Sequence, residues 1–140
     1  MQKTLKLRAA IAVMMLAAAA CVLLGKSVIY GPGFTLSYPY IGALFPAADS
    51  GFRATTTIYV WILLAGGVAA AVVVWLKPAW AALAAFAICL SSLVYHVIRS
   101  VQGGFSVFQI DGVWEFFMLA LPLVSAVLCI VLYRTIKQER

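Results

Sequence analysis

Four long apolar runs divide the sequence into alternating hydrophobic and polar stretches. The first covers residues 9–30 if Lys26 reaches back to the membrane surface, and the others cover residues 58–76, 79–98 and 113–133. A helix needs about 20 apolar residues to cross roughly 30 Å of hydrocarbon. None of the runs alternates like a membrane β-strand, and backbone groups in lipid must bond within their own segment. The sequence therefore predicts an all-α integral membrane protein, a single four-transmembrane-helix bundle over residues 1–140.

The first run also has features of a secretory signal peptide. Lys3, Lys6 and Arg8 precede an alanine-rich apolar segment, and Cys21 follows small residues, as at a lipoprotein cleavage site. However, Ala18 stands where such sites usually carry leucine, and the apolar residues continue past Cys21. We therefore favour a retained helix over a cleaved signal.

Composition excludes several classes of soluble protein. Hydrophobic residues make up 66% of the chain and charged residues 10%, and the mean hydropathy is +1.09. A soluble domain has roughly 45–50% apolar and about 25% charged residues. These values exclude a soluble enzyme, a disordered segment and a nucleic-acid-binding domain.

The distribution of lysine and arginine predicts the orientation of the helices. Of the 10 cations, seven fall on one side of the predicted membrane and three on the other. Cytoplasmic loops are enriched in cations, so both termini are predicted to be cytoplasmic, with residues 31–57 and 99–112 outside. Most of the lysine and arginine residues then lie near the anionic lipid of the cytoplasmic leaflet. This location accounts for the net charge of +6 without a nucleic-acid partner. The alanine-rich helices favour a bacterial inner (plasma) membrane.

Small residues predict how the second and third helices pack. Little more than Lys77–Pro78 joins the two runs, so they form an antiparallel hairpin with the proline at the first turn of the third helix. Small residues let helices approach closely in lipid. They gather at residues 66–71 and recur every four residues in the next run, at Ala81, Ala85 and Cys89. These two faces are expected to meet.

The outer segment 31–57 is unusually apolar for a loop. Such a segment either lies along the membrane interface, packs over the mouth of the bundle, or docks on another protein. The candidate anchors for a partner are its large aromatic residues Phe34, Tyr38, Tyr40 and Phe45.

Residues that ligate metals or carry redox chemistry are few. Cys21, Cys89 and Cys129 all lie within predicted spans and form no C-x-x-C motif, so we interpret them as small packing residues. His96 is the single histidine, and a haem would need a second ligand such as Met118. We interpret His96 as an interfacial residue that bonds to a loop carbonyl or a lipid headgroup. The sequence predicts no cofactor and no metal.

Ionisable residues gather at the outer edge of the third and fourth helices. His96, Arg99, Asp111 and Glu115 fall there, and Arg53 precedes the second helix. An unpaired carboxylate at the depth of Glu115 is costly, so we expect it to pair with Arg99 or Arg53. A structural ion-pair cluster is favoured over a ligand, quinone or proton site.

These features favour a small non-catalytic membrane protein. It would act as an accessory, assembly or immunity-type partner of a larger membrane complex, through its outer loop and helix faces. One alternative is a small oligomeric transporter or channel, although the middle of the predicted spans carries no carboxylate. Another is a quinone- or haem-associated subunit that uses His96, Arg99 and Glu115. The predicted partners are the lipid bilayer and either a larger membrane protein or further copies of the chain.

Overall fold

The computed structural model describes residues 2–31, 33–45, 54–102 and 113–139. Within these residues, four helical stretches are long and apolar enough to cross a membrane, which confirms a multi-pass, four-helix membrane protein. The first, third and fourth spans are single helices, α1 (Gln2–Leu24), α4 (Ala79–Gln102) and α5 (Val113–Gln138). The second span consists of three consecutive parts: α2 (Ala54–Trp61), the π-helix η2 (Ile62–Gly66) and α3 (Gly67–Val73). Each predicted run overlaps one of these four stretches, but the first two runs end beyond the observed helices, which stop at Leu24 and Val73.

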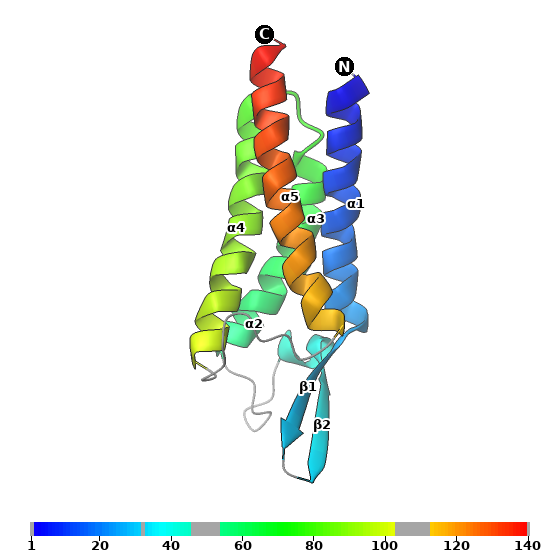
Figure 1. The fold of residues 1–140 in the computed structure, drawn as a ribbon, viewed down its shortest axis with the longest axis vertical. Helices are drawn as coiled ribbons and strands as arrows, with labels where there is room; N and C mark the ends of the chain where they lie inside the picture. The colour runs from blue at the N-terminus through cyan, green and yellow to red at the C-terminus, as the bar shows by residue number, and fades with distance from the viewer. Residues whose placement is uncertain (1, 32, 46–53, 103–112, 140) are drawn as a thin grey trace.

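The helices form an antiparallel bundle (Figure 1). Helix α5 packs most extensively against α4 and α1, and the second span contacts both α1 and α4. The start of α1 and the end of α5 lie at the same end of the bundle, here called the terminal end (Figure 1). The opposite end, from which two β-strands project, is called the hairpin end. The cytoplasmic location of the terminal end stays a prediction.

A β-hairpin follows α1 where the sequence predicted further helix. Strands β1 (Lys26–Gly31) and β2 (Phe34–Pro39) pair antiparallel, and Gly33 between them has a φ of 76°, which favours glycine. The first helix therefore ends at Leu24, and the prediction that it reaches residue 30 is wrong. The residue that follows this end, Gly25, has no room for a side chain. A Cβ on Gly25 would overlap the Cys21 carbonyl oxygen and lie 3.1 Å from the Trp114 ring.

The hairpin leads directly into a short helix that closes the bundle. This 3₁₀-helix is η1 (Tyr40–Ala43). The N–H of its first residue, Tyr40, donates to the Gly25 carbonyl at 3.1 Å. Tyr40, Ala43 and the following Leu44 are buried in one apolar cluster with residues of α1, the second span and α5. Of the three arrangements considered for the loop, these residues adopt the one that packs over the mouth of the bundle.

The second span contains a π-helical turn, Ile62–Gly66, that the hydrophobic pattern did not indicate.

Two neighbouring glycines in the second span face different helices. Successive residues of a helix point about 100° apart. A Cβ on Gly66 would lie 2.8 Å from the Ile88 side chain of α4, whereas one on Gly67 would lie 2.7 Å from the Met15 carbonyl oxygen of α1. The predicted contact between the second and third helices therefore holds for Gly66 but is wrong for Gly67, which packs on α1.

The connection between α3 and α4 agrees with the predicted tight hairpin. The N–H groups of Trp75 and Leu76 bond three residues back, which tightens the last turn, and α4 begins immediately after Pro78. The Arg8 side chain of α1 donates to the Leu76 carbonyl at 2.7 Å. This bond satisfies one of the free carbonyls at the helix end and ties α1 to the turn.

Candidate functional site at the hairpin end

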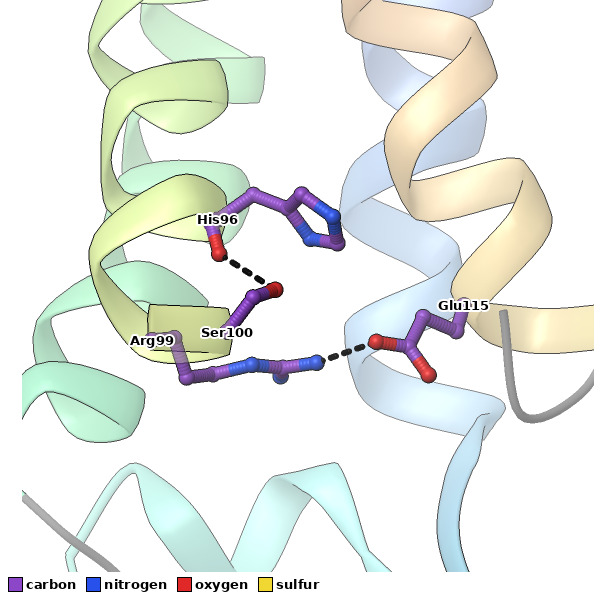
Figure 2. Close-up of polar contacts among 4 residues, drawn as sticks. All are labelled: His96, Arg99, Ser100 and Glu115. Carbon is purple, nitrogen blue, oxygen red and sulfur yellow. Dashed lines mark hydrogen bonds and ion pairs between the residues drawn. The ribbon is translucent and has the colours of Figure 1, made fainter. Parts of the chain in front are cut away.

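An ion pair joins α4 and α5 at the hairpin end (Figure 2). Arg99 lies in the last turn of α4 and Glu115 in the first turn of α5, where the helix dipoles favour a cation and an anion respectively. Arg99 Nη2 donates to Glu115 Oε1 at 2.6 Å, and the two side chains are 14% and 13% exposed. Of the two partners predicted for Glu115, Arg99 or Arg53, the structure pairs it with Arg99. Arg53 and Asp111, the other predicted members, lie outside the described residues.

Two buried tyrosines surround the guanidinium group of this pair. Its central carbon lies 4.9 Å from the centre of the Tyr59 ring, a cation–π contact. The phenol groups of Tyr59 and Tyr40 both interact electrostatically with Arg99. Removing one partner of a buried ion pair typically costs about 3–5 kcal/mol, because the other charge stays buried and uncompensated. This arrangement therefore ties η1, α2, α4 and α5 together through one charged group.

His96 lies inside the bundle rather than at its surface. The residue is 1% exposed, and its ring centre lies 6.1 Å from that of Tyr59. The Ser100 hydroxyl donates to the His96 carbonyl at 2.9 Å, within α4 (Figure 2). The interpretation of His96 as an interfacial residue is therefore wrong, and its burial excludes a bond to a lipid headgroup. The predicted alternative, a bond to a loop carbonyl, stays a prediction. Figure 2 shows the side chains of His96, Arg99 and Glu115, three of the five members of the predicted cluster, in the space between α4 and α5.

The candidate partner anchors differ sharply in accessibility. Tyr40 is 0% exposed, so the prediction that it contacts a partner is wrong, and its role is to fill the mouth of the bundle. Phe45 is 83% exposed. Phe34 and Tyr38 lie on β2, and their side chains are outside the described part of the structure.

A tryptophan holds Phe45 in its exposed position. The Trp61 indole N–H donates to the Leu44 carbonyl at 2.8 Å, and the Phe45 ring meets the Trp61 ring edge-on at 5.4 Å. The loop end is thus fixed against the second span. The sequence could not show this contact, since residues 46–60 separate Phe45 from Trp61 along the chain.

An apolar groove of about 490 Å³ runs along the bundle beside Trp61. Its walls come from the second span and α4, and its lining residues are Ile58, Trp61, Ile62, Ala65, Gly66, Ile88, Ser91 and Tyr95. The π-helical turn contributes Ile62, Ala65 and Gly66. Such turns often occur at functional sites. The groove is therefore a second candidate site, next to the exposed Phe45 ring.

Sulfur-bearing side chains meet in the bundle centre, which the sequence analysis missed. Cys89 of α4 donates to the Met15 sulfur of α1 at 3.6 Å and also interacts with the Cys129 thiol of α5. All three side chains are fully buried, and the cysteines are free thiols. Four-residue spacing places Cys89 on a small-residue face, but no sequence signal shows which residues of other helices face it.

Comparisons with protein-family models, with curated proteins and with solved structures find no match to this chain. No functional residue can therefore be transferred from a relative. What the hairpin end can do follows from its contacts alone: a neutralised ion pair stabilises it, and an exposed aromatic ring with an adjacent apolar groove offers a surface for another molecule.

Proposed function

We propose that this protein is a non-catalytic accessory or assembly partner of a larger membrane complex, located in a bacterial inner membrane. In this proposal the terminal end faces the cytoplasm and the hairpin end faces outward, as the distribution of cations indicates. The partner is an apolar transmembrane helix of another membrane protein, which docks along the groove beside Phe45.

The position of Phe45 is the observation that carries this proposal. Its ring is 83% exposed, yet the Trp61–Leu44 hydrogen bond and the contact with the Trp61 ring hold it in place. A fixed aromatic side chain loses little conformational entropy when it is buried in an interface, and aromatic anchors dominate binding energy in many interfaces. Phe45 therefore has the properties of an anchor.

The groove next to this anchor has the shape and composition that suit a helix. Ala65, Gly66 and Ser91 line it between larger residues, and small side chains let a second helix approach closely in lipid. The Ser91 hydroxyl bonds to the Ala87 carbonyl at 2.8 Å within α4, so it does not oppose an apolar neighbour. These contacts support a protein helix as the occupant.

The ion pair supports a structural role for the charged residues. Arg99 and Glu115 neutralise each other at 2.6 Å and connect α4 to α5. A carboxylate that carries a transported ion or proton must exchange its partner during the cycle. Glu115 is instead held by a short, charge-assisted bond to a guanidinium that itself lies over an aromatic ring.

Site-directed photocrosslinking in native membranes tests the proposal. A photoreactive amino acid is placed at Phe45 or at Ala65, and at Ile130 as the control, an exposed residue on α5 that does not line the groove. We expect one discrete adduct with a larger membrane protein from positions 45 and 65, and none from position 130. The substitution Ala65→Leu, which fills the groove, should abolish the adduct from position 45.

Other outcomes identify other functions. Adducts between two copies of this chain would favour the oligomeric transporter, and Glu115→Gln would then be tested in a flux assay. Adducts with lipid alone, at equal yield from all three positions, would overturn the docking proposal.

A further inference from the structure

The sulfur atoms of Met15, Cys89 and Cys129 form a cluster near the middle of the bundle. They come from three different helices, α1, α4 and α5, and belong to one buried core. The Cys89 thiol donates to the Met15 sulfur at 3.6 Å, and Cys129 lies in the same buried core. Two thiols and a thioether are the soft ligands that monovalent copper prefers in proteins.

The distance between the Met15 and Cys89 sulfurs suits a bound metal ion. A metal–thiolate bond of about 2.3 Å places the sulfurs of a trigonal site roughly 4 Å apart. The Cys89 and Met15 sulfurs are 3.6 Å apart, so a small adjustment of side-chain torsions opens the site. Methionine has three rotatable bonds and adapts readily.

The ligand set favours Cu(I) over zinc. Within the described residues, no group of three His, Cys, Asp or Glu side chains could hold a metal ion, so the usual four-ligand zinc site is not indicated. A thioether is a poor ligand for zinc and a good one for Cu(I). We propose that Met15, Cys89 and Cys129 form a binding site for a monovalent soft metal ion, Cu(I), in the core of the bundle.

The protons released on binding fix the charge of the site. A cysteine binds a metal ion as its thiolate, so two cysteine thiols and Cu⁺ give a copper bis-thiolate and two released protons. The Met15 thioether is a neutral third ligand, so the loaded site carries one net negative charge. Because a divalent ion would give a neutral site, charge does not select Cu(I), and the soft thioether ligand does.

A nearby buried hydroxyl is consistent with a polar occupant. Ser125 lies one turn before Cys129 on α5, hence on the same face of that helix. Its side chain is fully buried, and its hydroxyl has no hydrogen-bond partner among the described residues. Buried hydroxyls without partners are rare and call for an explanation, such as an ion or water that binds beside them.

Metal binding by the full-length chain in detergent micelles tests this site. Cu(I) is supplied anaerobically under reducing conditions from a chromophoric Cu(I) chelator, and its transfer to the protein is followed by absorbance. We expect one Cu(I) per chain, with X-ray absorption showing sulfur neighbours only. Cys89→Ala, Cys129→Ala and Met15→Leu should each weaken binding by at least about 100-fold, the upper end of the loss caused by removing an outer-shell partner.

Cys21→Ala is the matched control, because Cys21 is also buried but belongs to the apolar cluster at the hairpin end. It should bind Cu(I) like the unaltered chain. No Cu(I) uptake by the unaltered chain, or equal losses in Cys21→Ala, would overturn the proposal. So would full binding by the Cys89→Ala, Cys129→Ala double variant.

A second measurement needs no substitution and so does not depend on the variants folding. Redox-inert Ag(I) is added to the unaltered chain, and each cysteine is then scored by mass spectrometry for modification by a membrane-permeant maleimide. We expect protection of Cys89 and Cys129 but not of Cys21. Equal protection of all three, or of none, would contradict the site. The outcome does not depend on the proposed docking of a partner helix.

Discussion

The close contact between Gly67 and α1 gives a prediction whose size follows from the structure. In Gly67→Ala, the new Cβ would lie 2.7 Å from the Met15 carbonyl oxygen, about 0.7 Å short of the 3.4 Å at which ordinary van der Waals contact begins. Both groups are tied to helix backbones, so α1 and α3 must separate. The Ala19 Cβ at 3.3 Å blocks a sideways shift.

The expected cost combines two opposing terms. Overpacking a well-packed core costs typically 1–3 kcal/mol, and a clash with backbone falls at the upper end of about 3 kcal/mol. Alanine regains about 1 kcal/mol of helix propensity relative to glycine. We therefore expect Gly67→Ala to lower the free energy of unfolding by about 2 kcal/mol, roughly a 30-fold change in the ratio of folded to unfolded protein.

The neighbouring Gly66→Ala is the matched control. Its Cβ would lie 2.8 Å from a methyl group of Ile88, a side chain that can rotate away at a cost of about 0.5–1.5 kcal/mol. The gain of about 1 kcal/mol in helix propensity offsets that cost, so its stability should change by less than about 0.5 kcal/mol. The assay is reversible unfolding in mixed micelles with a rising fraction of sodium dodecyl sulfate, followed by circular dichroism. Equal effects of the two substitutions, or an unchanged Gly67→Ala, would refute the packing argument.

Three further substitutions probe the hairpin end. Glu115→Gln leaves Arg99 buried without a counter-charge and should lower the free energy of unfolding by about 3–5 kcal/mol in the same assay, while adding Arg99→Gln should recover at least half of the loss; strict additivity would contradict the pairing. Trp61→Phe removes the donor to the Leu44 carbonyl, so amide hydrogen exchange in residues 40–45 should accelerate by about tenfold, equivalent to about 1.4 kcal/mol; unchanged exchange would mean that other contacts hold η1. Gly33→Ala forces a side chain into a positive φ and should cost about 1–2 kcal/mol, seen as faster exchange confined to the hairpin; faster exchange throughout the bundle would show that the hairpin supports the helices.

The candidate site illustrates how much local sequence can predict. Arg99 precedes a helix end and Glu115 follows a helix start, and both lie at membrane depth, where an unpaired charge is costly. Few cations were available on that side of the membrane, so the partner of Glu115 could be narrowed to Arg99 or Arg53, and the structure decides for Arg99. The burial of His96 could not be predicted, because it depends on the rotation of α4 about its own axis, which contacts with α5 and the second span fix.

For the outer segment 31–57, the sequence predicted less and the tertiary contacts decided more. Its aromatic composition indicated that it would not extend into water, but three arrangements fitted that requirement equally well. The hydrogen bond from Tyr40 to Gly25 and the burial of the Tyr40 side chain decide between them. These contacts join residues 15 positions apart through a β-hairpin, and the alternation of residues 26–39 is too weak to predict such a hairpin.

The sequence by itself determined the number of spans and their approximate positions, because the length of an apolar run must match the thickness of a bilayer. It did not determine the residues at which each helix ends. Tertiary structure alone decided which faces of the spans meet. In lipid every helix face is apolar, so hydrophobicity does not distinguish the core from the surface, and close packing does. That packing turns Gly67 toward α1, exposes Phe45 beside a groove, and brings Met15, Cys89 and Cys129 together in the centre of the bundle.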